Sequence, residues 1–185
     1  IESAVGECAR KAGRDPLQFR LDHLDDARLA GVLRRVGQAA HWVARADESP
    51  SPLSRAQLRR GRGIACGIYK GMSYAAVVAD IEVDAGTGAI RVTRLWCAHD
   101  CGLVVNPDQV RAQCEGNLVW GLGMVLHERL PVAQGGVAAR TFAESPIPRL
   151  SQVPAMQVDL VEDEGHPPPG AGGTPTVAAA PALAP

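Results

Sequence analysis

The chain has 185 residues, of which 46% are hydrophobic and 21% charged, an ordinary balance for a globular protein. A formal net charge of −1 leaves no basic excess to neutralise phosphates, so we expect no nucleic-acid partner. No apolar run approaches the roughly 20 residues of a membrane span, and the five cysteines lack the spacing of a disulfide scaffold.

The first 50 residues are predicted to form helices that end in a linker. Apolar residues recur there at helical spacing, and the predicted helices cover residues 1–13, 15–24 and 27–43. The stretch from Glu48 to Leu53 combines prolines and serines, which is typical of a linker. We therefore expect a helical segment with its linker over residues 1–50 and a second unit over residues 51–185.

From Arg62 onward the apolar period changes to two, which is typical of strands. Asp84 to Gly88 has the composition of a hairpin loop between two of them. The predicted strands cover residues 64–69, 74–83, 90–97, 129–132, 137–142 and 156–162, and the predicted helices cover 107–128 and, interrupted by Pro181, 174–184. Because these elements do not alternate as regular strand–helix–strand units, the sequence favours an α+β fold with N-terminal helices, mixed or antiparallel strands and a long central helix.

The stretch from Cys101 to Gly116 carries the most informative local pattern. Asn106 is suited to cap a helix with its side-chain oxygen, and Pro107 fits the first helical position. Gln113 and Gly116 are three residues apart, so they share a helix face on which an amide lies beside a position without a side chain. A large polar ligand can approach such a face closely. A buried stripe is predicted on the same helix at Val110, Cys114, Leu118, Leu122 and Val125.

An ordered series of residues runs through this stretch: Asp100, Gly102, Asn106, Pro107, Gln113, Glu115, Gly116, Gly121 and Gly123. Further motifs follow the same order along the chain, at Gly13-Arg14-Asp15-Pro16, Gly61-Arg62-Gly63, Ser73-Tyr74 and Pro169-Gly170-Ala171-Gly172. Together they resemble the molybdopterin-binding large subunit of the xanthine dehydrogenase and aldehyde oxidase family, and most closely the branch formed by isoquinoline 1-oxidoreductase β-subunits. The resemblance implies a molybdopterin-binding-domain-like fold in which residues 51–185 are the C-terminal part, truncated before the final helix is complete.

The resemblance also implies a cofactor site. In the family, the glutamine that matches Gln113 hydrogen-bonds a molybdenum-molybdopterin dinucleotide, and an amide suits this role because it both donates and accepts. Gly116 gives the ligand room, and Gly170 and Gly172 lie in the loop that borders the metal. The implied activity of the intact subunit is that of a molybdenum hydroxylase, which oxidises N-heterocycles or aldehydes with water as oxygen donor.

The general base of the family is absent from this sequence, so no catalytic residue is assigned. The family loop reads Gly-x-Gly-Glu, and the position of its glutamate is occupied here by Gly173. Either the glutamate is substituted or two residues are missing, since members of the branch read Gly-Glu-Pro-Gly-Thr-Pro where this chain reads Gly-Gly-Thr-Pro. Because loss of an acid–base group lowers rates by about 10²- to 10⁴-fold, we expect an impaired hydroxylase.

The resemblance further implies partners. Neither the earlier pterin-binding loop of the family nor the cysteine patterns of its Fe–S subunit occur in this sequence. We therefore expect two partners, the remainder of the large subunit and a small [2Fe–2S] electron-transfer subunit. A cytoplasmic location is expected, or a periplasmic one if an export signal precedes Ile1.

Two other interpretations use the same residues. The missing glutamate and the missing upstream half also fit a non-catalytic fragment that serves as a structural or binding module. A zinc site is a weaker alternative, since most zinc sites use short paired ligand spacings; its ligands would be Cys97, His99, Cys101 and Cys114. We expect no metal at these residues, because free cysteines are often buried as small hydrophobes.

Overall fold

A computed structural model describes residues 1–43, 58–141, 143–163 and 165–183. Its centre is a four-stranded sheet in the order β1-β2-β3-β6. β1 (Leu58–Tyr69), β2 (Ser73–Asp84) and β3 (Ile90–Asp100) are antiparallel neighbours, and β6 (Ala155–Leu160) runs parallel to β3. This mixed sheet, packed against helices, confirms the predicted α+β class.

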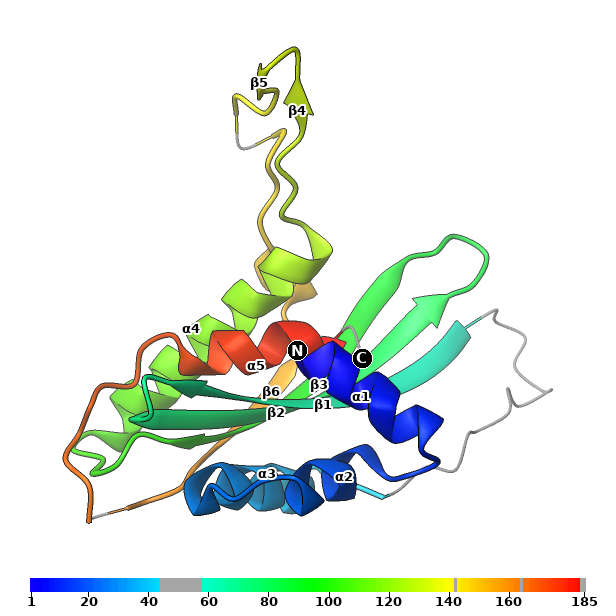
Figure 1. Cartoon of the computed structure of the whole chain (residues 1–185). Coiled ribbons are helices and arrows are strands. Elements are labelled where there is room, and N and C mark those ends of the chain that lie inside the picture. Colours follow the sequence, from blue (N-terminus) through cyan, green and yellow to red (C-terminus); the bar gives the residue numbers. More distant parts are fainter. Residues whose placement is uncertain (44–57, 142, 164, 184–185) are drawn as a thin grey trace.

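Helices cover both faces of the sheet (Figure 1). On one face lies α3 (Ala27–Ala39), and on the other lie α4 (Pro107–Leu126) and α5 (Thr174–Leu183). Because side chains alternate along a strand, Trp96 of β3 enters the core beneath α3 and Cys97 enters the core beneath α4 and α5. The end of β3 therefore presents residues to both helical layers.

The N-terminal helices are fastened to the sheet by buried polar contacts. α1 (Glu2–Lys11) precedes α2 (Pro16–Asp22), whose buried Arg20 donates from Nε to Glu2 Oε2 at 3.0 Å. The same carboxylate oxygen accepts the Cys66 N–H of β1 at 2.8 Å. The predicted linker over residues 48–53 and the predicted boundary at residues 50 and 51 lie outside the described residues.

The packing of α5 on α4 depends on a missing side chain. A Cβ at Gly121 of α4 would lie 2.7 Å from the Ala179 Cβ and 3.3 Å from the Thr176 carbonyl oxygen. Real Cβ atoms do not approach so closely, so glycine allows the two helices to come into contact at this point. The glycine-rich character of α4 therefore has a packing cause here.

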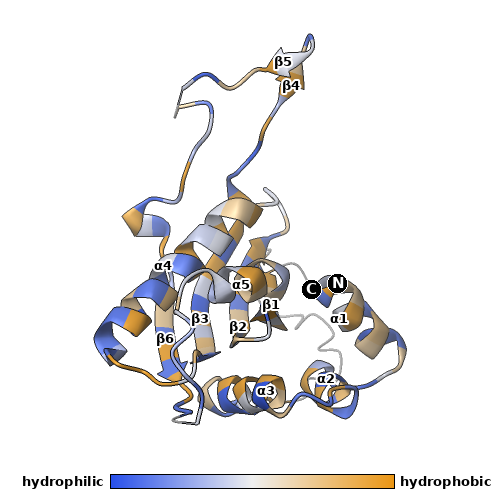
Figure 2. Cartoon of the chain, turned by 60° about the vertical axis from the view of Figure 1, so that its left-hand side comes forward, coloured by the Kyte–Doolittle hydropathy of each residue, from blue (hydrophilic) through white to orange (hydrophobic). Residues whose placement is uncertain are grey.

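The predicted strands over 129–132 and 137–142 are largely wrong. The structure has only two-residue strands, β4 (Val132–Ala133) and β5 (Gly136–Val137), in an arm that stands away from the body of the molecule (Figures 1 and 2). The apolar side chains of this arm find no core, and Val132 is 69% exposed. A two-stranded hairpin without a buried face gains little from lengthening its strands. A one-turn 3-10 helix, η1 (Leu150–Gln152), follows before β6.

Two further expectations need correction. Cys114, Leu118 and Leu122 form a buried stripe as predicted, but Val125 is exposed and Val110 only half-buried, because each of these two residues lines an open hollow. Pro181 does not interrupt α5, which continues to Leu183; the proline removes one backbone donor, and the helix ends two residues later. Among the described residues, no helix is long and apolar enough to cross a membrane.

Candidate functional site

An open hollow of about 280 Å³ lies where β3 ends and α4 begins. Its walls come from the turn after β3, the first two turns of α4 and the proline–glycine loop before α5. The start of α4 is fixed locally, because the Asn106 side chain accepts the Gln109 N–H at 3.2 Å and Pro107 follows as the first helical residue. The predicted helix cap is confirmed.

Gln113 and Gly170, two of the four predicted cofactor-binding residues, line this hollow together. Gln113 is exposed, and its side-chain amide has no hydrogen-bond partner among the described residues, which leaves it free for a ligand. Gly170 adopts φ +104°, a conformation that other residues rarely take, and no side chain projects from it into the hollow.

The other predicted residues lie beside the hollow and do not line it. Gly116 and Gly172 are both exposed, and a Cβ at either position would meet nothing within 4 Å. Gly173 follows with φ +85°, so a glutamate at this position would be held in a strained backbone conformation. The three glycines leave the surroundings of the hollow open.

Gly102 allows the turn after β3 to touch the proline–glycine loop. It has φ +66°, and a Cβ there would lie 2.6 Å from the Pro167 carbonyl oxygen and 2.8 Å from that of His166. The next residue, Leu103, donates its N–H to the His166 carbonyl oxygen at 2.9 Å. Only glycine fits this approach, which explains its place in the ordered series.

A charged network that the sequence pattern did not reveal lies behind the turn. Arg28 of α3 makes a two-point contact with Asp100, at 2.8 Å from Nε to Oδ2 and 2.5 Å from Nη2 to Oδ1. Its Nε is also 3.6 Å from Asp163 Oδ2, which in turn lies 2.7 Å from His166 Nδ1. Asp163 is only partly exposed and joins Arg28 and His166 through one carboxylate oxygen.

The pKa of Asp100 is lowered by this network. Burial acts to raise it, but hydrogen bonds from the Arg28 guanidinium and the Gly102 N–H, together with the positive charge of Arg28, outweigh that effect. The Arg28 pKa is raised, chiefly by its hydrogen bond to Asp100 and against the effect of burial. Both groups are therefore charged, and the turn after β3 is attached to a fixed carboxylate.

Buried hydroxyl and amide groups connect α5 to the turn of α4 that carries Gln113. The Thr176 hydroxyl donates to Asn117 Oδ1 at 2.9 Å, and Asn117 Nδ2 donates to the Gln113 carbonyl oxygen at 2.8 Å. Thr174, the first residue of α5, shares a buried hydroxyl–hydroxyl hydrogen bond with Ser73 of β2. Sequence reasoning missed these contacts, because a threonine or asparagine on a helix gives no signal of its distant partner.

The residues of the alternative zinc site do not assemble. Among the described residues, no group of three or more His, Cys, Asp or Glu side chains is arranged to hold a metal ion. The Cys97 pKa is raised by its hydrogen bond to Cys114 and by burial, as expected for a buried pair of free thiols. His99 is fully buried, with Nδ1 3.0 Å from the Tyr74 carbonyl oxygen, and its Nε2 has no hydrogen-bond partner within the part of the chain that the structure describes.

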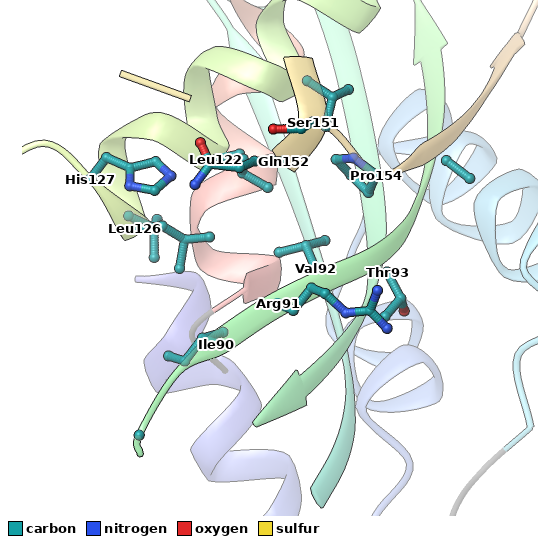
Figure 3. Close-up of a pocket in the computed structure, with 14 residues that line it drawn as sticks. Ile90, Arg91, Val92, Thr93, Leu122, Leu126, His127, Ser151, Gln152 and Pro154 are labelled. Carbon is teal, nitrogen blue, oxygen red and sulfur yellow. The ribbon is translucent and has the colours of Figure 1, made fainter. Parts of the chain in front are cut away.

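A larger hollow of about 860 Å³ lies at the opposite end of β3 (Figure 3). It is lined by the first residues of β3, the last turn of α4 and residues 151–155. Its one arginine, Arg91, is already paired with Glu82 at 2.6 Å. None of the predicted cofactor residues reaches it, so we place the candidate site at the smaller hollow.

Comparison with known proteins decides the family. Residues 68–154 match the molybdopterin cofactor-binding domain. The chain is 34% identical over 190 residues to one of the subunits of nicotinate dehydrogenase from Pseudomonas putida, covering 99% of this chain and 16% of that protein. It is 37% identical over 167 residues to the beta subunit of isoquinoline 1-oxidoreductase from Brevundimonas diminuta, covering 88% and 20%. The chain belongs to the molybdopterin-binding large-subunit family.

Solved structures place the whole chain within the molybdopterin-binding fold. Quinoline 2-oxidoreductase from Pseudomonas putida 86 superposes with a TM-score of 0.55 at 28% identity, over 60% of this chain and 15% of that one. Aldehyde oxidoreductase from Desulfovibrio gigas superposes with a TM-score of 0.77 over 98% of this chain and 37% of that one; its 13% identity shows the fold alone. The chain thus spans a fifth or less of the two sequence relatives, 16% and 20%.

Proposed function

We propose that this chain forms one wall of a molybdenum-molybdopterin dinucleotide site in the large subunit of a molybdenum hydroxylase that oxidises N-heterocycles or aldehydes with water as oxygen donor. The observation that carries the proposal is the hollow in which Gln113 and Gly170 meet. Similarity to a nicotinate dehydrogenase subunit and to quinoline 2-oxidoreductase supports N-heterocycles as substrates.

The residues of the hollow fit such a cofactor. Gln113 offers an unpaired amide that can donate to and accept from a pterin or a nucleotide, and Gly170 leaves room for close approach. At about 280 Å³ the hollow is below the roughly 300–1,000 Å³ of common ligand pockets. Most of a dinucleotide would stay exposed there, so a second wall from the remainder of the large subunit completes the site.

The chain's own residues bind and orient in this proposal, and the bound molybdenum centre supplies the redox chemistry. A small [2Fe–2S] partner subunit would accept the electrons. Gly173 cannot remove a proton, so hydroxylation by this chain is slow. The glutamate is either substituted by Gly173 or lost with a neighbouring residue. The φ of +85° at Gly173 supports the loss of two residues, because this conformation favours glycine and the family's Gly-Glu-Pro-Gly-Thr-Pro also has glycine before Thr-Pro.

The second candidate function is a non-catalytic binding module of the same family, and the missing glutamate favours it. The two functions share the cofactor hollow and differ only in turnover. A preparation that binds molybdenum without oxidising quinoline, nicotinate or benzaldehyde would support the module, whereas slow oxidation would support the impaired hydroxylase.

The test compares two preparations by metal analysis. The 185-residue chain alone is expected to retain no molybdenum, because it has one wall of the site. In the second preparation, called the graft, this chain replaces the matching region of the beta subunit of isoquinoline 1-oxidoreductase. The graft is expected to retain about one molybdenum per polypeptide, because both walls of the cofactor site are then present. Stoichiometric molybdenum in the isolated chain would contradict the two-wall proposal, and its absence from the graft would contradict the cofactor site.

A further inference from the structure

The N-terminal helical layer supplies a side chain that reaches both segments bordering the hollow. We infer that Arg28 of α3 is a positioning residue, which sets the separation between the turn after β3 and the proline–glycine loop and so the width of the hollow. What the hollow binds rests on the proposed function, whereas the positioning role does not. Arg28 lies outside residues 68–154, the part that matches the cofactor-binding domain.

The first contact of Arg28 fixes the turn after β3. Its guanidinium binds both oxygens of Asp100, whose side chain is only 2% exposed. Asp100 Oδ1 also accepts the Gly102 N–H at 2.9 Å. A planar guanidinium that meets a carboxylate at two points fixes its orientation as well as its position. The backbone at Gly102 is therefore set by a side chain from a different layer of the fold.

The second contact reaches the loop on the other side of the hollow. Asp163 Oδ2 lies 3.6 Å from Arg28 Nε, and it holds His166 through the ring Nδ1. The carbonyl oxygen of His166 accepts the Leu103 N–H, which joins the loop to the turn. The carboxylates of Asp100 and Asp163 thus share one cation. Without Arg28, the charge of the buried Asp100 would be unpaired and would repel that of Asp163.

Two further contacts hold Arg28 in place. Its guanidinium carbon lies 4.5 Å from the centre of the Tyr74 ring, and its backbone N–H donates to the capping Asp26 side chain at 2.9 Å. Its side chain is 17% exposed. Arg35 on the same helix differs, since its side chain is 53% exposed and pairs with Asp159 at 2.9 Å on the surface. Arg35 is therefore a matched control with the same chemistry in another place.

The experiment is amide hydrogen exchange on the 185-residue chain, read residue by residue. In Arg28→Gln, the Leu103 amide is expected to exchange about tenfold faster or more, because the loop that supplies its acceptor is released. Val77, in the centre of the sheet, is expected to keep its protection. Arg35→Gln is expected to leave Leu103 unchanged. Asp163→Asn removes the charge that contacts Arg28 and His166 and leaves the Arg28–Asp100 pair in place, so it is expected to speed exchange at Leu103 and leave Gly102 protected.

An unchanged Leu103 amide in Arg28→Gln would overturn the inference, and so would acceleration no greater than that of Val77, since that pattern reports global unfolding. If Arg28→Gln does not fold, Asp163→Asn decides, because it leaves the Arg28–Asp100 pair intact. A failure of the proposed function is distinguishable: Gln113→Ala in the graft would then retain full molybdenum, while the exchange result at Leu103 would stand.

Discussion

The Thr176 hydroxyl donates a hydrogen bond to Asn117 Oδ1 at 2.9 Å, inside the interface between α5 and α4. Asn117 continues the connection with a hydrogen bond to the Gln113 carbonyl oxygen. The helix that follows the proline–glycine loop is thereby joined to the helical turn that bears the candidate ligand-binding amide. The proline–glycine loop is therefore tied to the rest of the site at two places, through α5 to the helical turn of Gln113 and through His166 to the turn after β3.

Replacement of Thr176 by valine is expected to lower the free energy of unfolding by about 1–3 kcal/mol, because Asn117 Oδ1 would be left buried without a donor. Urea denaturation measures the change. The control Val177→Thr adds a hydroxyl at the exposed neighbouring position, and it is expected to change the free energy of unfolding by no more than about 0.5 kcal/mol. A Thr176→Val effect no larger than that of the control would show that the buried bond contributes little.

Two glycines of α4 are predicted to respond in opposite directions to alanine. Gly116→Ala places a Cβ in open space on an exposed helix face and is expected to stabilise the fold by about 0.5–1 kcal/mol. Gly121→Ala forces α4 and α5 apart, since its Cβ would lie 2.7 Å from that of Ala179, and is expected to destabilise by about 1–3 kcal/mol. Thermal unfolding of both variants checks the signs, and equal signs would contradict the described packing.

His99 predicts a specific dependence of stability on pH. Burial lowers its pKa, against the smaller raising effects of its bond to the Tyr74 carbonyl and of the nearby Asp100 carboxylate. As the pH falls, the unfolded chain, with a histidine pKa of about 6.5, therefore takes up a proton at a higher pH than the folded chain does. The stability from neutral His99 is complete above that pH and is lost as the pH falls below it.

His99→Leu removes this contribution and leaves the other histidines in place. Between about pH 7.5 and pH 5.5, the free energy of unfolding of the wild type is expected to fall more steeply than that of the variant. Urea denaturation at the two pH values provides the comparison. Equal slopes would mean that His99 titrates normally in the folded protein.

Restoring the family loop is predicted to restore turnover in the graft. Insertion of Glu-Pro between Gly172 and Gly173 recreates Gly-Glu-Pro-Gly-Thr-Pro and keeps glycine at the position with φ +85°. The oxidation rate of isoquinoline is expected to rise by about 10²- to 10⁴-fold. Insertion of Gln-Pro, the matched control, supplies the same geometry without a base. A similar gain from both insertions would show that loop length, and not proton transfer, limits the reaction.

Local chemistry made much of the fold predictable from the sequence. The cap at Asn106 and the proline after it fixed the start of α4, and the alternation of apolar residues located the three long strands. Prediction was poorer where local pattern and tertiary packing disagree. Val132 and Val137 have the pattern of longer strands, but no core lies beneath them.

The candidate site was predictable only where the family motif extends. Gln113 and Gly170 followed from the ordered series, and the structure places them around one hollow. Arg28 and Asp163 were not found, because an ion pair between distant segments leaves no spacing signal in either one. Asp100 was noticed as part of a motif, but its partner could be identified only once α3 was placed against the sheet.

Gln113 is proposed to bind molybdopterin from the wall of the hollow, and the molybdenum content of two glutamine variants of the graft measures this role. Gln113→Ala is expected to purify with clearly less molybdenum per polypeptide than the unmodified graft. Gln38→Ala, which changes an exposed glutamine on α3 outside the hollow, is expected to retain the full content. Equal molybdenum in both variants would show that the Gln113 side chain does not hold the cofactor.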